Sequence, residues 1–228
     1  MKILVCGCSY FTIDSNWPNT HFTEIIAEKL NANLINLAER GSSNFAIRLQ
    51  VQSCLEIKPD LVILGFTCPD RLEHNFGNKN YNSNMHVHNL KYLRDSKFVK
   101  DRYACIKSDP IPALIQSDTD LAPVVKNYVK YFYNYELQKH KDYLIAQTAL
   151  YFLKTNDIPF VFSEAGLGSD NLRLFKDFKN NFVASGNPWP FTSKGEKMWE
   201  RAYHTESEQQ IKLAEIWFNK INKLYNFV

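Results

Sequence analysis

The stretch Leu61-Val62-Ile63-Leu64-Gly65 carries the strongest fold signal in the sequence. Its four apolar residues follow the turn-forming Lys58-Pro59-Asp60 and are not interrupted by any polar residue. Strands without polar alternation are covered on both faces, as in parallel sheets. We therefore predict that this stretch is a central strand of a parallel sheet.

Three other short apolar segments are predicted to join this strand, namely residues 2–6, 34–37 and 158–162. Apolar residues recur at helical spacing in the segments between and after them. The four sets are Phe22, Ile25, Ile26 and Leu30; Ile47, Val51, Cys54 and Leu55 as an inner face; Leu137, Leu144, Ile145, Tyr151 and Phe152; and Ile211, Ala214, Phe218 and Ile221, with Trp217 beside them. Asn19 or Thr20 is placed to cap the first helix. Strands that alternate with helices predict an α/β fold, a three-layer flavodoxin-like wound parallel sheet.

One region interrupts this alternation. Residues from about 74 to about 135 hold six asparagines between Asn75 and Asn89, followed by a tyrosine-rich run from Tyr128 to Tyr135. We interpret the region as an aromatic-rich insertion, partly helical because long structureless loops are unusual in compact domains. A chain of 228 residues is otherwise predicted to form a single domain, residues 1–228. The insertion could pack on its own domain or on a second copy, which leaves a homo-oligomer open.

The composition of the chain indicates which kinds of binding partner and which cellular location to expect. Hydrophobic residues make up 45% and charged residues 22%, as in ordinary globular proteins. A net charge of +3 without a Lys/Arg cluster predicts no nucleic-acid partner, and no apolar run is long enough to predict a membrane span. Five cysteines without a paired framework are typical of reduced thiols. Because only five residues separate Met1 from Gly7, we expect no signal peptide and a cytoplasmic location.

Candidate catalytic residues follow the predicted strands, where wound α/β sheets bind ligands. Ser9 follows the first strand, the segment 41–44 follows the second, and the segment 67–73 follows the third. His204 precedes the last predicted helix. A serine, glycine amides and a histidine base are the parts that acyl transfer needs.

The order of these blocks resembles that of the SGNH/GDSL hydrolases, and more narrowly a divergent Gly-Cys-Ser-Tyr/Phe branch common in phage and bacterial genomes. The matching blocks are Gly7-Cys8-Ser9-Tyr10, Trp17-Pro18, Asn36-Leu37-Ala38-Glu39-Arg40-Gly41-Ser42-Ser43-Asn44, Gly65-Phe66-Thr67, Thr67-Cys68-Pro69-Asp70-Arg71-Leu72-Glu73 and His204. The match covers residues 1–73 well and the last third of the chain loosely.

The resemblance implies an ester-cleaving serine hydrolase with Ser9 as nucleophile and His204 as general base. It also implies that the backbone amides of Ser9 and Gly41 bind the oxyanion. We suggest that the Asn44 side chain or the Thr67 hydroxyl supplies a third donor. Four further residues of these blocks are assigned to substrate binding: Cys8, Tyr10, Arg71 and Glu73. The expected substrate is an O-acyl ester of a sugar, glycan or small metabolite, and the chemistry requires no metal or organic cofactor.

Three positions depart from the family pattern. Cys8 replaces the usual aspartate, Thr67 replaces the usual asparagine, and Arg201 stands where the triad acid is expected. Loss of the orienting acid in a serine triad can cost roughly 10⁴ in turnover. The candidates to replace it are Glu200, Glu206 and Glu73.

Simpler interpretations stand beside these roles. Ser9 alone would be a turn residue, and Ser42 and Ser43 are expected to cap a helix. Arg71 and Glu73 could form a surface ion pair or bind a substrate carboxylate. His204 could simply precede a helix capped by Thr205. The pair His86 and His88 lacks the further ligands of a metal site. The missing acid favours, as an alternative function, a catalytically inactive binding protein with the same fold.

Overall fold

The computed structural model describes nine segments of the chain. They are residues 1–14, 17–39, 42–67, 71–72, 104–105, 131–132, 134–164, 175–183 and 207–227.

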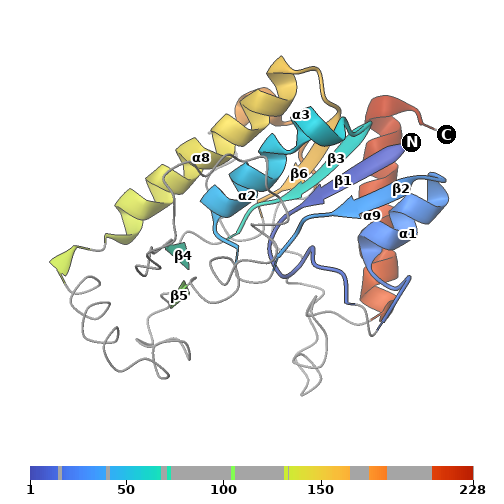
Figure 1. Ribbon diagram of the computed structural model, residues 1–228, viewed down its shortest axis with the longest axis horizontal. Coiled ribbons are helices and arrows are strands. Elements are labelled where there is room, and N and C mark those ends of the chain that lie inside the picture. The colour runs from blue at the N-terminus through green and yellow to red at the C-terminus, as the bar shows by residue number, and fades with distance from the viewer. Residues whose placement is uncertain are drawn as a thin grey trace.

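A four-stranded parallel sheet forms the centre of the molecule (Figure 1). Its strands are β1 (Lys2–Cys6), β2 (Asn33–Asn36), β3 (Leu61–Gly65) and β6 (Phe160–Ser163), in the order β2-β1-β3-β6. All five residues of β3 are buried, because helices cover both faces of the sheet. This arrangement confirms the predicted wound α/β fold, with the fourth strand starting two residues later than expected.

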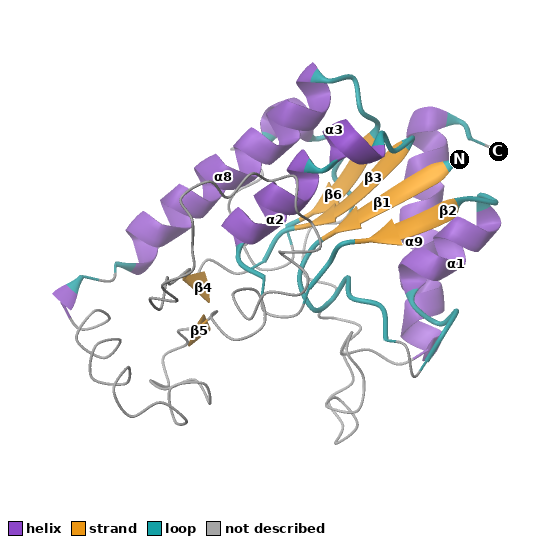
Figure 2. Cartoon of the chain, in the orientation of Figure 1, coloured by secondary structure: helices purple, strands orange, loops and turns teal. Residues whose placement is uncertain are grey.

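Two pairs of helices sandwich the sheet (Figure 2). On one face α1 (Phe22–Lys29) packs against α9 (Ser207–Tyr225), and on the other α2 (Asn44–Gln52) packs against α8 (Tyr135–Thr155). Three short elements accompany these layers. They are α3 (Cys54–Ile57), the 3-10 turn η2 (Lys176–Phe178) and an isolated bridge between Phe162 and Phe182.

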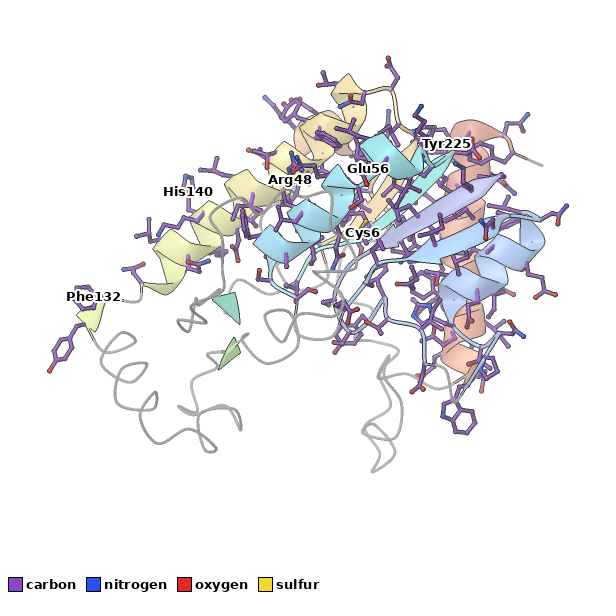
Figure 3. All side chains as sticks on the ribbon, in the orientation of Figure 1. Cys6, Arg48, Glu56, Phe132, His140 and Tyr225 are labelled. Atoms are coloured by element: carbon purple, nitrogen blue, oxygen red, sulfur yellow. The ribbon has the colours of Figure 1, made fainter. Side chains whose placement is uncertain are left out.

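Long-range contacts fix these layers to the sheet (Figure 3). The Tyr225 hydroxyl of α9 accepts a hydrogen bond from the Phe160 amide at 2.9 Å and donates to the Phe160 carbonyl at 2.8 Å. Between α2 and α8, the Arg48 guanidinium lies 4.7 Å from the centroid of the Phe152 ring. The last helix and the outer strand are therefore tied together directly.

The first helix begins at a different cap from the one predicted. His21 is the N-cap of α1, with its Nδ1 accepting from the Thr23 amide at 3.3 Å. The Glu24 carboxylate accepts from the His21 amide at 3.0 Å and completes a capping box. Asn19 instead adopts a positive φ of 61°, which places it in the preceding turn.

Three helical faces also differ from the prediction. On α8, Leu137, Leu144 and Tyr151 are exposed. The chain breaks at Ser53 between α2 and α3, so Leu55 turns outward and is 52% exposed. On α9, Ile211 is 50% exposed, whereas Trp217 is 4% exposed and packs in the core. The hydrophobic face of α9 is therefore centred on Trp217.

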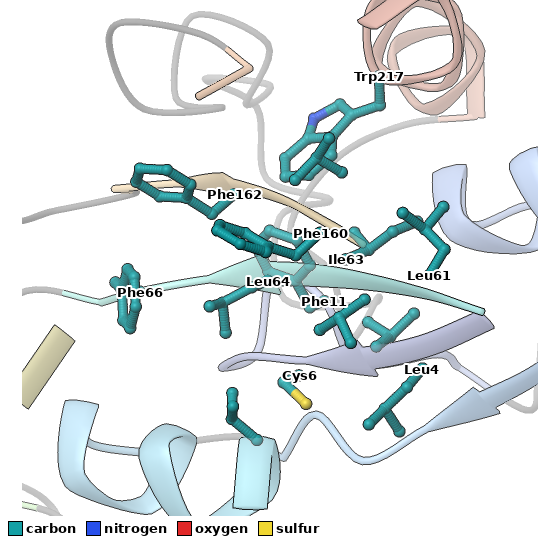
Figure 4. Packing of buried hydrophobic residues seen from close by; sticks show 14 of the residues in the cluster. Leu4, Cys6, Phe11, Leu61, Ile63, Leu64, Phe66, Phe160, Phe162 and Trp217 are labelled. Carbon is teal, nitrogen blue, oxygen red and sulfur yellow. The ribbon is translucent and has the colours of Figure 1, made fainter. Parts of the chain in front are cut away.

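Phe11 explains why two strand ends carry glycine. Its ring is buried beside Phe22 and Trp217, at centroid distances of 5.4 and 5.7 Å (Figure 4). A Cβ at Gly7 would approach the Phe11 side chain to 2.8 Å, and a Cβ at Gly65 would overlap its ring. Phe11 therefore anchors the loop after β1 over the ends of two neighbouring strands.

Most of the predicted insertion lies outside the described residues. Its described residues are 104–105, 131–132 and 134–135. Of these, Ala104–Cys105 form β5, which pairs antiparallel with β4 (Arg71–Leu72), just before the predicted insertion. The single-domain organisation and the helical content of the insertion stay predictions. Within the described segments, no helix combines the length and apolar character of a bilayer-spanning segment.

Candidate active site

The strand order places the candidate site between β1 and β3. From β1 the chain passes outward to β2 and then returns to β3 on the other side of β1. Wound sheets of this kind bind ligands at such a reversal, beyond the carboxyl ends of the strands. Ser9 follows β1 and Thr67 follows β3, so both lie at this edge.

Ser9 is held in a tight turn directly after β1. The Phe11 amide donates to the Cys8 carbonyl at 2.9 Å, and the Thr12 amide donates to the Ser9 carbonyl at 3.4 Å. From β2, the Asn36 side chain donates to the Phe11 carbonyl at 2.7 Å. Ser9 is 7% exposed and Cys8 is fully buried. The turn and the Phe11 anchor therefore hold the Ser9 backbone in place.

Gln50 of α2 connects this strand end to the loop after β2. Its side-chain oxygen accepts from the Gly7 amide at 2.7 Å, and its Nε2 donates to the Gly7 carbonyl and the Ser42 hydroxyl, each at 3.3 Å. Ser43 caps α2 by accepting from the Ala46 amide at 3.2 Å, as expected, whereas Ser42 bonds to Gln50 instead. Ser42, just before α2, is thus joined through Gln50 to the end of β1 at Gly7.

Asn44 holds the backbone of Thr67 from two sides. Its side-chain oxygen accepts from the Thr67 amide at 2.8 Å, and its Nδ2 donates to the Thr67 carbonyl at 3.0 Å. The same Nδ2 donates to Asp142 at 3.1 Å. An amide NH₂ group carries two hydrogens, so both hydrogens of Asn44 are engaged.

Asp142 of α8 supports this clamp. One carboxylate oxygen accepts from Asn44 and the other accepts from Gln138 Nε2 at 3.1 Å. Asp142 is 2% exposed and Asn44 is fully buried. Hydrogen bonds to a buried charged group are among the stronger ones, so α8 fixes the orientation of the Asn44 amide.

The His21 side chain is hydrogen-bonded to the backbone of Tyr10, in the loop that carries Ser9. Burial lowers the pKa of His21 to about 4, against a smaller upward effect of the hydrogen bond to the Tyr10 carbonyl. The ring is therefore neutral at pH 7. Its Nδ1 accepts from the Thr23 amide, so we assign the proton to Nε2, which donates to the Tyr10 carbonyl at 3.1 Å.

Glu164 is a residue at this edge that the sequence analysis did not identify. It directly follows β6 and is 2% exposed, and its Oε2 has no hydrogen-bond partner among the described residues. The neighbouring Ser163 hydroxyl is likewise buried without a described partner. Burial raises the pKa of Glu164 to about 7. The signal available in the sequence was a pair of polar residues placed directly after a predicted strand.

Several predicted site residues lie outside the described part of the chain. These are Gly41, Glu73 and His204, together with the acid candidates Glu200 and Glu206. Arg71 is placed only by the backbone of β4, where it pairs with Cys105. The structure therefore places Cys8, Ser9 and Tyr10 after β1, and Thr67 with its partner Asn44 after the neighbouring strand β3. Among the described side chains, no three His, Cys, Asp or Glu residues gather as metal ligands would.

Comparison with known proteins supports the architecture. No family model and no curated protein matches the chain. Solved structures similar to it include a psychrotrophic esterase from Pseudoalteromonas, with a TM-score of 0.52 and 10% identity over 99% of this chain and 98% of that one. A GDSL-like lipase from Bacteroides thetaiotaomicron has a TM-score of 0.50 and 11% identity over 98% of this chain and 88% of that one.

An acetyl xylan esterase from the rumen bacterium Butyrivibrio proteoclasticus has a TM-score of 0.52 and 11% identity, over 100% of this chain and 65% of that one. At these identities the likeness concerns the fold. It agrees with the strand order and the helix layers described above, and confirms the predicted fold class.

Proposed function

We propose that this chain, which has the SGNH/GDSL hydrolase-like fold, is a serine esterase with Ser9 as its nucleophile. The observation that carries the proposal is the position of Ser9. It lies in a fixed turn at the carboxyl end of β1, where the strand order reverses, and β3 brings the clamped Thr67 to the same edge.

In the proposed reaction, the Ser9 hydroxyl attacks the ester carbonyl while His204 accepts its proton. The tetrahedral intermediate expels the alcohol, which takes the proton from His204 and leaves an acyl group on Ser9. Water, deprotonated by His204, then attacks the acyl-enzyme; the Ser9–acyl bond breaks, His204 returns the proton to the Ser9 oxygen, and the acid is released. No metal or organic cofactor takes part.

The oxyanion would be stabilised by the backbone amides of Ser9 and Gly41. The sequence offers two candidates for the third donor, the Asn44 side chain and the Thr67 hydroxyl. Because both Asn44 amide hydrogens are engaged, we assign the donor to the Thr67 hydroxyl. Asn44 then acts as a positioning residue that fixes the Thr67 backbone.

The proposed substrate is an O-acyl ester of a sugar or small metabolite. The acetyl xylan esterase of similar fold supports this class. Cys8 and Tyr10 adjoin the nucleophile, and Arg71 and Glu73 follow β3, so we propose that they contact the substrate. A cytoplasmic location is proposed with it, supported by free thiols at three buried cysteines, Cys6, Cys8 and Cys54.

Turnover of p-nitrophenyl acetate tests the proposal. We expect activity that falls at least 100-fold in Ser9→Ala, because the nucleophile is removed, with the thermal unfolding midpoint of the variant monitored as a control for folding. Equal turnover by wild type and Ser9→Ala would contradict the assignment.

The alternative is a catalytically inactive ligand-binding protein with this fold. The observation that favours it is Arg201, which stands three residues before His204 where the triad acid is expected. Folded wild-type protein that turns over no ester but is stabilised by a small ligand would support this alternative.

A further inference from the structure

The carboxyl edge of the sheet continues beyond Thr67 to a second polar position. In the β3–β6 register Gly65 lies opposite Ser163, and the Phe66 amide donates to the Ser163 carbonyl at 3.0 Å. Glu164 therefore leaves the sheet next to the strand end that leads to Thr67. Neighbouring strands are about 4.8 Å apart, so the β6 end lies roughly 10 Å from the β1 end that carries Ser9.

Two consecutive side chains at this position are buried without described partners. Ser163 and Glu164 are 3% and 2% exposed, and the Ser163 Oγ and the Glu164 Oε2 each lack a hydrogen bond to any described residue. An unsatisfied buried polar group costs about 1–3 kcal/mol, and more when it is charged. Two such groups on consecutive residues, at the edge where wound sheets bind ligands, require an explanation.

We propose that Ser163 and Glu164 form a subsite that hydrogen-bonds hydroxyl groups on the uncharged alcohol part of the substrate. This inference rests on the proposed esterase function and assigns the part of the substrate that lies beyond the reacting ester. Because the β6 end lies two strand spacings from the β1 end that carries Ser9, the subsite would contact a group attached to the ester. It would not contact the reacting carbonyl carbon itself.

The chemistry of the edge supports an uncharged, hydroxyl-bearing ligand. The described segments that directly follow the four strands contain Asp14, Glu39 and Glu164 and no Lys or Arg. In these segments an anionic group would meet carboxyl groups; Arg71, assigned above to the substrate, lies further along the chain, in β4. Because burial raises the pKa of Glu164 to about 7, its carboxyl can both accept from and donate to a hydroxyl near neutral pH.

The test compares two ester classes in matched variants. Wild type, Glu164→Gln and Glu164→Leu are assayed with p-nitrophenyl acetate, which has no hydroxyl group, and with a panel of mono-O-acetyl methyl pyranosides. We expect Glu164→Leu to lower kcat/KM for the acetyl pyranosides by about 10-fold or more, mainly through KM, and to leave p-nitrophenyl acetate within about 2-fold. Glu164→Gln should fall between the two, because its amide retains one donor and one acceptor function.

Stability supplies a readout that separates a binding role from a structural one. A buried carboxyl without partners is costly, so Glu164→Leu should unfold at the same temperature as wild type or a higher one. Glu56→Gln, an exposed change on α3, serves as the control and should alter neither substrate. Equal losses on both ester classes, or a lower unfolding temperature in Glu164→Leu, would overturn the subsite.

The design also separates the subsite from the proposed function. If no ester is hydrolysed, the esterase proposal fails, and the same variants are compared for thermal stabilisation by methyl pyranosides. Stabilisation of wild type that is lost in Glu164→Leu would then support the subsite alone. Absence of stabilisation in wild type would overturn the subsite as well.

Discussion

Gly65 shows how one missing side chain fixes the position of the loop that carries Ser9. The Phe11 ring occupies the space that a Cβ at Gly65 would take, and the ring also lies against Gly7. Both strand ends must therefore lack side chains if Phe11 is to anchor the turn that contains Ser9. The glycines of the Gly-Cys-Ser and Gly-Phe-Thr blocks thus have a packing role in this chain.

We expect Gly65→Ala to lower the free energy of unfolding by about 1–3 kcal/mol, because the added methyl group overpacks the core at the Phe11 ring. Urea denaturation measures the change. The double variant Gly65→Ala/Phe11→Leu should lose less than the sum of the two single changes, because the smaller side chain makes room for the methyl group. Strict additivity of the two changes would contradict the packing role.

Asn44 provides a second prediction at the residue scale. Asn44→Ala removes the clamp on the Thr67 backbone and leaves buried Asp142 with one partner fewer, so we expect a loss of about 1–3 kcal/mol in stability and a lower kcat. A double-mutant cycle with Asp142→Asn should give a coupling energy of about 0.5–3 kcal/mol. Unchanged turnover in Asn44→Ala would remove Asn44 from the site.

At the scale of elements, α1 begins at a buried titratable cap. The pKa of His21 is about 4 in the folded chain, compared with 6.5 for an ordinary histidine. As the pH falls below about 6.5, the histidine is protonated in the unfolded chain but stays neutral in the folded chain. The free energy of unfolding therefore decreases between about pH 6.5 and pH 4. The loss amounts to about 3 kcal/mol at most.

Replacement of His21 by asparagine tests this linkage. Asn can cap the helix but does not titrate, so His21→Asn should show a flatter stability profile between pH 7 and pH 4, even if its stability at pH 7 is lower. Urea midpoints across this range provide the measurement. Parallel profiles for wild type and variant would contradict the buried, neutral state of His21.

At the scale of the whole molecule, Glu164 produces the opposite pH dependence. Its pKa of about 7 in the folded chain exceeds the ordinary value of 4.5, so the unfolded chain loses the proton first as the pH rises. The contribution of protonated Glu164 to the free energy of unfolding is therefore fully present below about pH 4.5. It decreases as the pH rises to about 7, by about 3 kcal/mol at most. Glu164→Gln should therefore gain stability relative to wild type as the pH rises from 5 to 8, and a constant difference would contradict the shift.

The parts of the molecule differ in how far the sequence predicted them. The strands were predictable because their apolar runs are continuous, and Ser9 was placed at the right edge because it directly follows β1. The cap of α1 was not predictable from the sequence, because histidine is seldom an N-cap residue. The Asn44 clamp joins groups 23 and 98 residues apart in the chain, which no local pattern reveals. Glu164 became a candidate only once tertiary packing had buried it.

Covalent labelling of Ser9 by a fluorophosphonate probe tests the central claim most directly, because the probe reacts with activated serines and requires no knowledge of the substrate. We expect labelling of the wild-type protein that is lost in Ser9→Ala and in His204→Ala, while all three proteins unfold at similar temperatures. Absence of labelling in folded wild-type protein, or labelling that persists in Ser9→Ala, would contradict it.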